Sequence, residues 1–297
     1  MELRTLRYFL EIAAEKNMTV AAANLHVSQS ALSHQMRELE AELNAVLFER
    51  TNRQTLLTED GRRLRARAEA IISLVDSTED EFLSSDEKVF GLVRIGAGES
   101  SCLEYFGRAA VRLREKHPGI TFNIFSAIAD DISDRMDKGL LDFALYFEPV
   151  SHDNLEYIEV PVKHIGGLLV RDDSPLAEKD FVTREDVESV PLIISSRQNS
   201  DEGYIAGVFG IEKEKMNVVA SGNLTYNKAM LVRSGLGCVL SSDAHDFAEG
   251  SGLKFLPLKP GTETSMIFAW RKGHRLTKAA ELFLEELKKE FALIRPE

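Results

Sequence analysis

The chain has 297 residues, of which 44% are hydrophobic and 28% charged, which is the ordinary composition of a soluble globular protein. This length exceeds what one hydrophobic core comfortably fills, so two or three domains are expected. The opening MELRTLRYFLEIAAEK has only short apolar runs broken by charges. This pattern is not that of a signal peptide or of a membrane span, so the cytoplasm is the expected location. The two cysteines, Cys102 and Cys238, exclude a disulfide framework and a cysteine metal site.

The charge is unevenly distributed along the chain. A formal net charge of −12 argues against a protein that coats nucleic acid over its whole surface. Residues 1–67, however, hold ten Lys/Arg and nine Asp/Glu, so residues 68–297 carry the remaining −13. Several arginines in the first part lie close together, Arg50, Arg53, Arg62, Arg63, Arg65 and Arg67. A local electrostatic footprint for nucleic acid is therefore compatible with the acidic total.

The first 43 residues predict a helix-turn-helix. Residues 3–15 carry apolar side chains at helical spacing. Asn17 is a candidate N-cap for a second helix, MTVAAANL, and Ser28 for a third, which begins QSALSHQMREL. The third helix has a stripe expected to be buried, Leu32, Met36 and Leu39. The second and third helices are joined by the short turn HVS, as in a helix-turn-helix.

The next segment predicts a wing and a long helix. VLFER and TLLT are typical of two short strands around a polar turn at residues 52–54, after a left-handed C-cap at Asn44. Thr58 is expected to cap a long helix, which the acidic run STEDEFLSSDEK ends as a hinge. This helix carries a heptad seam that predicts a partner helix, most simply from a dimer: Leu64, Ala68, Ile71, Val75, Thr78 and Phe82.

From residue 89 onward, short strands alternate with helices, which predicts parallel sheets with crossover helices. The first series has strands LVRIGAG, ITFNIF and LDFALYF, with helices at 102–116 and 130–138. The second has IGGLLV, PLIIS, MNVVAS and GCVLSS, with helices near 201–208 and 225–234, before SMIFAW and TKAAELFLEELKKEF. Two similar α/β halves predict a bilobed module with its pocket between the lobes.

Residues 3–61 resemble the DNA-binding end of the LysR-type transcriptional regulators. The family pattern runs through LRYF, the AA and L of the second helix, VSQ, LE, LF.R and LT..G. Weaker similarity covers the whole chain, in HPGITFNI, GLLDFAL and LVRSGLG.

The resemblance implies an α/β protein with an N-terminal all-α winged helix-turn-helix, a long linker helix, and two Rossmann-like lobes of the periplasmic-binding-protein type. The expected domains are a DNA-binding domain at 1–57, a linker and dimerisation helix at 58–88, and an effector-binding domain at 89–297. Within the last, lobe 1 comprises 89–163 plus 269–297 and lobe 2 comprises 164–268.

The function implied by the resemblance is sequence-specific promoter binding by a homodimer or homotetramer. A small-molecule effector between the lobes would control DNA binding or activation, and RNA polymerase is a further expected partner. No catalytic residues, cofactor or metal are expected. Three residues depart from the family pattern, Ser30 for Pro, His34 for Arg and Asn44 for Gly. Ser30 and His34 leave the helix intact but make the operator sequence hard to transfer from relatives.

The third helix is the expected DNA-reading element. Its polar residues are Ser28, Gln29, Ser30, Ser33, His34 and Arg37. Gln can pair with adenine and Arg with guanine or phosphate in a major groove, whereas carboxylates would be repelled there. The wing residues Arg50, Thr51 and Arg53 are expected to position the helix through phosphate or minor-groove contacts. A merely solvated polar face is the alternative for both sets.

The effector site is expected at two loops that face each other. A Gly-rich strand end precedes the helix in AGESSCLEY, where orphan N–H groups attract anions. Ser100 and Ser101 match effector-site positions of the family, although an ordinary N-cap turn is the alternative. The facing lobe offers four candidates, Ser195, Ser196, Arg197 and Thr225. The two serines are expected at a strand end, Arg197 could pair with a carboxylate, and Thr225 is expected to cap the next helix toward the cleft, which together favour a small carboxylate-bearing effector. Asp130 and Asp131 would oppose an anion if they point inward, and an amine-containing or zwitterionic effector would then fit better.

Three other interpretations are weaker. An enzyme on the α/β lobes lacks support, because no G-x-S-x-G, H-E-x-x-H, C-x-x-C or phosphate-loop pattern occurs and the histidines have no metal-like spacing. A solute-binding protein, or another cytoplasmic small-molecule binder, leaves the first 88 residues unexplained. Thiol sensing at Cys102 would need a lowered thiol pKa at the helix start, and Cys238 is expected to pack as a small hydrophobe.

Overall fold

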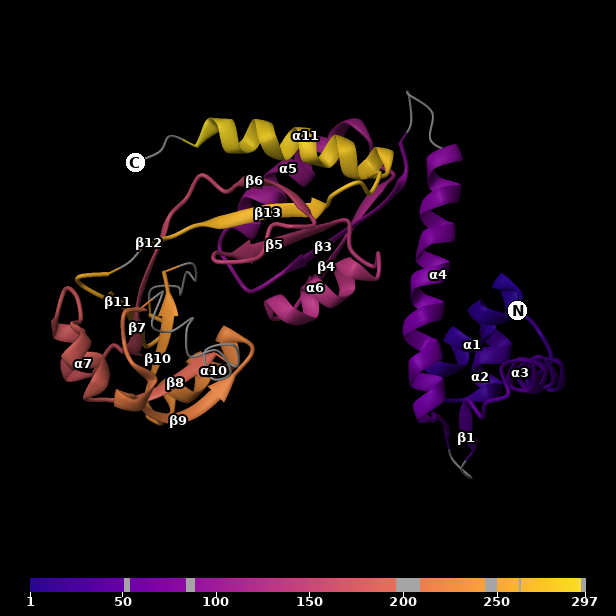
Figure 1. Cartoon of the computed structure of the whole chain (residues 1–297), viewed down its shortest axis with the longest axis horizontal. Coiled ribbons are helices and arrows are strands. Elements are labelled where there is room, and N and C mark those ends of the chain that lie inside the picture. The colour runs from indigo at the N-terminus through magenta and orange to yellow at the C-terminus, as the bar shows by residue number, and fades with distance from the viewer. Residues whose placement is uncertain (51–53, 84–88, 196–208, 244–249, 262, 295–297) are drawn as a thin grey trace. The chain divides into compact units, whose positions relative to one another are not determined.

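The computed structural model describes residues 1–50, 54–83, 89–195, 209–243, 250–261 and 263–294 (Figure 1). The chain divides into two compact units, Met1–Leu83 with Lys138–Leu140, and Ser84–Asp137 with Leu141–Glu297. In the described ranges, no helix combines the length and the apolar character that a membrane crossing requires.

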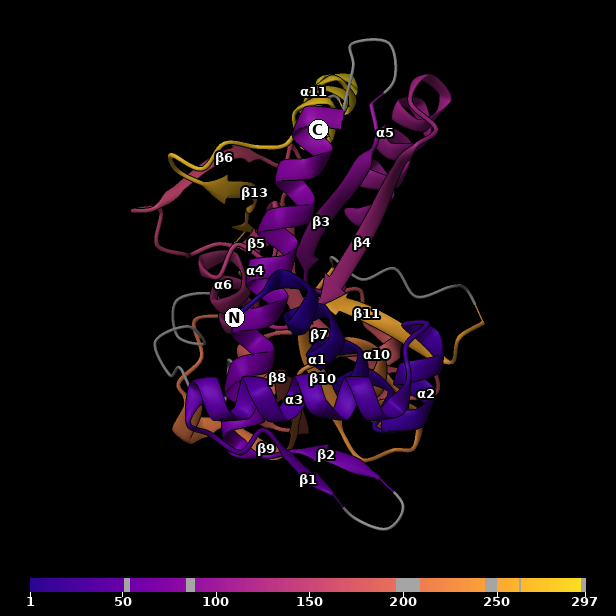
Figure 2. The same cartoon turned by 90° about the vertical axis from the view of Figure 1, so that its right-hand side faces the viewer.

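The first unit is the predicted winged helix-turn-helix. Its elements are α1 (Leu3–Glu15), α2 (Met18–Asn24), α3 (Gln29–Leu43), β1 (Phe48–Arg50), β2 (Thr55–Leu57) and α4 (Glu59–Leu83). The predicted caps are confirmed: Asn17 Oδ1 accepts hydrogen bonds from the backbone of α2, and Ser28 Oγ accepts one of 3.1 Å from Ala31 N. Asn44 adopts a left-handed φ of 48° after α3. Figure 2 shows α3 along its length with the β1–β2 hairpin beside it.

The core of the first unit fixes α3 and the wing together. Leu32, Met36 and Leu39 of α3 are at most 1% exposed. Glu40 Oε1 accepts hydrogen bonds from Leu47 N (2.8 Å) and Phe48 N (3.3 Å), which ties the wing to α3. Gly61 belongs to the LT..G pattern because a Cβ at this position would run into the Leu47 carbonyl oxygen.

The structure refines two expectations for α4. The helix continues to Leu83, which lies within the acidic run that is expected to end it. Part of its seam has a partner helix in the same chain: Ala68 is fully buried and Leu64 and Ile71 pack on the same core, because α1 lies against α4. Farther along the helix, Leu74 is 62% exposed.

The second unit contains two mixed sheets. The first has the strand order β4-β3-β5-β13-β6, and β3 is parallel to β4 and β5 whereas β13 is antiparallel to β5 and β6. Its elements are β3 (Gly91–Ala97), α5 (Leu103–Lys116), β4 (Ile120–Ser126), α6 (Ala129–Asp137), β5 (Phe143–Phe147), β6 (Leu155–Glu159), β13 (Met266–Arg271) and α11 (Lys278–Leu293).

Both faces of the first sheet are covered. Phe143 and Phe268 point to the face on which α5 and α11 pack, and Ala144 and Ile267, the alternate residues, point to α6 (Figure 1). Burial on both faces is typical of the parallel part of an α/β sheet.

The second sheet has the strand order β11-β7-β10-β8-β9, with β12 paired to β7. Its elements are β7 (His164–Arg171), η1 (Pro175–Glu178), α7 (Arg184–Glu188), β8 (Pro191–Ser195), η2 (Lys213–Lys215), β9 (Asn217–Gly222), α10 (Thr225–Arg233), β10 (Cys238–Ser242), β11 (Leu253–Pro257) and β12 (Glu263–Thr264). β8 is parallel to β9 and β10, and β7 is antiparallel to its neighbours. The expected helix near 201–208 lies outside the described residues.

The expectation of purely parallel sheets is therefore wrong at the strands that join and border the lobes. The short strands β6, β11 and β12 were not predicted because their sequences lack the continuous apolar runs of the central strands. The chain passes between the two sheets after β6 and again after β12, so the carboxyl ends of β3 and β8 lie near this double crossing.

Candidate functional site

One face of α3 is solvent-exposed and polar. Gln29, Ser30, His34 and Arg37 are exposed, and Ser28 at the cap is exposed as well. On a helix with 3.6 residues per turn, Ser30, His34 and Arg37 lie opposite the buried stripe. Ser33 differs from the expectation, because it flanks Leu32 and Met36 and is only 8% exposed. Its hydroxyl therefore contributes little to the exposed face.

The carboxylate nearest to this face is engaged in local contacts. Glu38 Oε2 lies 3.3 Å from His34 Nδ1 and accepts a hydrogen bond of 2.8 Å from Gln35 Nε2. Arg37 Nε donates a hydrogen bond of 3.4 Å to the Ser33 carbonyl one turn earlier. These contacts hold the charged side chains of α3 along the helix.

The arginines after α3 fall into two groups. Arg50 ends β1, but its side chain and the expected wing residues Thr51 and Arg53 lie outside the described residues. Arg62 has a local role, because its Nη1 donates to the Leu57 carbonyl (3.0 Å) and its Nη2 to Glu59 (2.7 Å). Arg65 pairs with Glu69 at 2.8 Å. Much of the cluster from residue 62 onward thus stabilises α4 itself.

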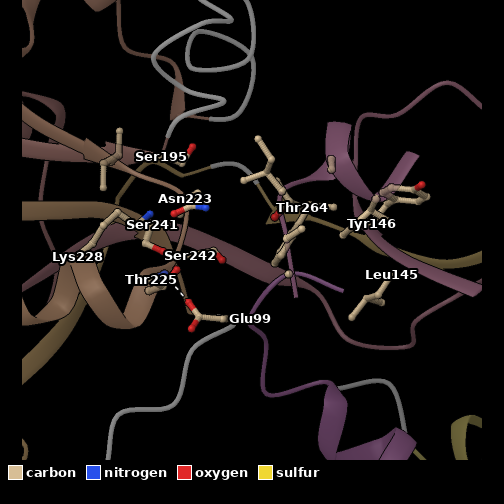
Figure 3. Close-up of a pocket in the computed structure, with 18 of the residues that line it drawn as sticks. Glu99, Leu145, Tyr146, Ser195, Asn223, Thr225, Lys228, Ser241, Ser242 and Thr264 are labelled. Carbon is tan, nitrogen blue, oxygen red and sulfur yellow. Dashed lines mark hydrogen bonds between the residues drawn. The ribbon is translucent and has the colours of Figure 1, made fainter. Parts of the chain in front are cut away.

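The second unit has a cavity of about 160 Å³ at the ends of strands from both sheets (Figure 3). Its apolar wall includes Ile128, Ile132, Leu145, Tyr146, Phe147 and Phe209. Its polar wall includes Ser195, Asn223, Thr225, Ser241, Ser242 and Thr264. Two charged residues, Glu99 and Lys228, also line it. An apolar cavity with a few convergent polar groups is the usual form of a small-molecule site.

The expected effector residues are only partly brought together in this cavity. Ser195 and Thr225 line it, and Ser196 and Arg197 lie outside the described residues. The loop after β3 contributes Gly98 and Glu99 in place of the expected Ser100 and Ser101.

The two serines have other surroundings. Ser100 Oγ accepts a hydrogen bond of 3.2 Å from Cys102 N and so shapes the turn before α5, while Ser101 is exposed. Asp130 and Asp131 are exposed and do not belong to the lining, which removes the repulsion that they would have caused.

Glu99 caps α10 from the other sheet. Its carboxylate oxygen Oε2 accepts hydrogen bonds from Thr225 N and from Tyr226 N (3.1 Å for the latter). Leu224 is the N-cap residue of α10 and has no side-chain acceptor. The expectation that Thr225 caps this helix is therefore wrong, since Thr225 is its first residue and the orphan N–H groups are satisfied by Glu99. Figure 3 shows this contact as a dashed line.

Lys228 is a buried cation in the cavity wall. The residue is 4% exposed, and its ammonium group forms no hydrogen bond or ion pair with any described residue. Burial lowers the pKa of Lys228 to about 8, and the charge of Glu99 offsets part of this effect. Most Lys228 side chains are still charged at pH 7. In Figure 3, Lys228 lies on the same side as Asn223 and Ser241, across from Leu145 and Tyr146.

A second buried group joins the two sheets. His164 Nε2 lies 3.4 Å from Cys102 Sγ, and His164 Nδ1 lies 3.0 Å from Asp243 Oδ1. Burial disfavours the charged imidazole, but the hydrogen bonds to Asp243 and Cys102 outweigh it and raise the pKa of His164 to about 9. Cys102 is 1% exposed. Cys238 is the other cysteine, and burial raises the pKa of its thiol.

Glu99 and Lys228 are the charged residues of the cavity lining that sequence reasoning missed. Lys228 had a signal, because it interrupts the buried stripe of α10 that Thr225, Ala229 and Val232 form at helical spacing. Glu99 lies between the glycine and the serines of AGESS and had no comparable signal, since its partner is more than a hundred residues away.

Comparison with known families identifies both units. Residues 3–62 match the bacterial regulatory helix-turn-helix protein model of the lysR family, and residues 87–292 match the LysR substrate binding domain. The chain belongs to the LysR family of transcriptional regulators. It thus combines a DNA-binding helix-turn-helix with an effector-binding domain, and it is not an enzyme.

Relatives of this LysR-type regulator match most of its length. The uncharacterized HTH-type transcriptional regulator YfeR of Shigella flexneri is 25% identical over 280 residues, which cover 94% of this chain and 91% of YfeR. BsdA of Bacillus subtilis is 29% identical over 208 residues, 69% of this chain and 70% of BsdA.

Among solved structures, CbnR, a LysR family regulator, has a TM-score of 0.74 at 19% identity and covers 98% of this chain and 99% of CbnR. Full-length CbnR in complex with its target DNA has a TM-score of 0.72 at 19% identity, over 98% of this chain and all of that one. At 19% identity, the similarity to these structures supports a shared fold and no more.

Proposed function

We propose that this LysR-type regulator reads promoter DNA with the exposed face of α3, and that a small carboxylate-bearing effector in the cavity controls the reading. The regulator would act as a homodimer or homotetramer in the cytoplasm, with RNA polymerase as a further partner. A symmetric oligomer suits an inverted-repeat operator, because each α3 then meets one half-site.

The exposed face of α3 is the observation that carries the DNA-reading role. Buried leucines anchor the helix, so its orientation is fixed while Gln29, Ser30 and Arg37 stay exposed. Gln can form two hydrogen bonds with adenine, and Arg can do the same with guanine. No carboxylate precedes Glu38 on the helix, which keeps repulsion from phosphates low.

The cavity supports the effector role. Its volume of about 160 Å³ suits a molecule of single-ring size, since engineered cavities of about this volume bind benzene. Among the described residues of its lining, Lys228 is the only cation, and this favours an acid.

A gel-retardation assay with the DNA upstream of the regulator's own gene tests the proposal. Gln29→Ala and Arg37→Ala should each weaken specific binding by roughly ten- to a hundredfold, the loss of one bidentate base contact. Arg4→Ala is the matched control, because it removes an exposed positive charge from α1 in the same unit. Unchanged site preference in both α3 variants would refute the proposal. Light scattering with and without this DNA measures the oligomeric state.

A further inference from the structure

The two charged side chains of the described cavity lining differ in their hydrogen-bond partners. Glu99 accepts two backbone hydrogen bonds, whereas the ammonium group of Lys228 has no hydrogen-bond or ion-pair partner among the described residues. Both belong to the same end of α10, because Glu99 caps its first turn and Lys228 is its fourth residue. Their positions determine which charges a ligand can carry.

Lys228 needs an anion. A buried charge without a partner is costly, and the depressed pKa of Lys228 expresses this cost. The lining on the same side supplies polar groups that can share an acid group with the ammonium ion, namely Ser195, Asn223, Ser241 and Ser242. A carboxylate at this place would be held by a charge-assisted hydrogen bond, the stronger kind.

The other anion-binding position is already filled. A helix N-terminus attracts anions through its orphan N–H groups and the helix dipole. At α10 these N–H groups donate to Glu99, so the chain supplies its own carboxylate there. A second anionic group of a ligand would meet the negative charge of Glu99, and like charges at short range repel.

We propose that Lys228 binds the acid group of a monoanionic effector, and that Glu99 excludes dianions by occupying the N-terminal end of α10. This inference rests on the proposed effector function of the cavity. The remainder of the ligand would be apolar and no larger than about one six-membered ring, because Leu145, Tyr146 and Phe209 form the wall and the volume is about 160 Å³.

The test uses the full chain and a series of acids from acetate through butyrate to cyclohexanecarboxylate. Each acid is accompanied by its neutral amide and by a dicarboxylate of similar size, and binding is measured at pH 7 by calorimetry and thermal shift. Wild-type protein should bind monocarboxylates, with the ring acid tighter than acetate, in preference to amides and dicarboxylates.

Two variants separate the roles of the charges. Lys228→Met should weaken the binding of monocarboxylates by roughly ten- to a hundredfold, as expected for a hydrogen bond to a charged group. Glu99→Gln keeps an oxygen acceptor for α10 and should improve dicarboxylate binding by about tenfold relative to monocarboxylate binding. Lys254→Met is the control, because Lys254 is exposed and donates to the Ala177 carbonyl away from the cavity.

Preferential binding of amides or amines, equal affinity of acids for wild type and Lys228→Met, or no acid binding at all would overturn the inference. An unchanged preference between mono- and dicarboxylates in Glu99→Gln would overturn the part that concerns Glu99. DNA retardation is measured in parallel. If wild-type protein retards its promoter but no acid binds, this inference and the carboxylate-bearing effector of the proposed function are wrong, while the DNA-reading role of α3 stands. If retardation is absent, the DNA-reading role fails, whatever the acids do.

Discussion

His164 and Lys228 should make the stability of the effector domain depend on pH in opposite directions. Both are buried bases, but the pKa of His164 is raised from 6.5 to about 9 and that of Lys228 is lowered from 10.5 to about 8. Below pH 6.5 the folded-state advantage of charged His164 is complete, and it is lost as the pH rises through about 9. Folding instead disfavours charged Lys228, so stability returns as the pH rises from about 8 to 10.5.

Each contribution is large on the scale of protein stability. Each pKa changes by about 2.5 between the unfolded and folded states, and one pKa unit corresponds to 1.36 kcal/mol, so each group contributes about 3 kcal/mol over its range. Stability of the wild-type protein should fall between pH 6.5 and 8, pass through a minimum between 8 and 9 where the two effects cancel, and then rise.

Two variants separate the contributions of Lys228 and His164 to the pH dependence of stability. Lys228→Met should lose the rise above pH 8, so its stability relative to wild type falls by about 3 kcal/mol between pH 8 and 10.5. His164→Gln should lose the decline between pH 6.5 and 9, and His164 is buried beside Asp243, so a lower overall stability is also expected.

Urea unfolding followed by circular dichroism, at half-unit steps from pH 6 to 10.5, measures these curves. The free energy of unfolding of each variant is compared with that of wild type at the same pH, because the contributions of titratable groups that all three proteins share then cancel. A constant difference between Lys228→Met and wild type over pH 8–10.5 would show that Lys228 is not a desolvated cation, and the argument for its anion site would lose its physical basis.

Other substitutions test single contacts. Glu99→Ala should destabilise α10 by about 1 kcal/mol through loss of its cap, Glu99→Gln should cost less, and acetate should restore part of the loss in Glu99→Ala; thermal unfolding with and without acetate measures all three. Gly61→Ala should destabilise the first unit by about 1–3 kcal/mol and weaken DNA retardation, because its methyl group would meet the Leu47 carbonyl; normal stability would contradict this. Cys102→Ser should keep the response to effector in the retardation assay, because Asp243 still holds His164, and a lost response would revive thiol sensing.

The elements that could be predicted from the sequence are those set by local interactions. The caps at Asn17, Ser28 and Thr58 bond to N–H groups within three residues, so one short segment contains all the information. Family motifs also predict some contacts between segments. Gly61 of the LT..G pattern is an example, because it packs against the Leu47 carbonyl where a Cβ would not fit. Ser33 was misjudged because it lies at the border of the buried stripe, where the helical period alone does not decide exposure.

The cavity depends on contacts that no local pattern encodes. The antiparallel pairing of β13 with β5 and of β7 with β10 brings distant segments together, and with them the ends of β3, β8 and β10. Ser195, one of the expected effector residues, ends β8 and lines the cavity, whereas the loop after β3 brings Gly98 and Glu99 to it rather than the expected Ser100 and Ser101. In this loop Ser101 is exposed, whereas Glu99 lines the cavity.

The error about Thr225 has a physical cause. The sequence predicts that Thr225 caps α10, but the first N–H groups of a helix can satisfy only a few acceptors. At α10 the N–H groups of Thr225 and Tyr226 donate to Glu99 instead. The sequence indicates that this cap is missing, because the residue before the helix is Leu224, whose side chain cannot accept a hydrogen bond. A helix that starts without a capping residue needs an acceptor from elsewhere, and in a bilobed protein the facing lobe can provide it. If an acid binds in the cavity as proposed, Lys228 is the cation that the described lining leaves for it, and the missing cap and the buried lysine would together set the charge of the effector.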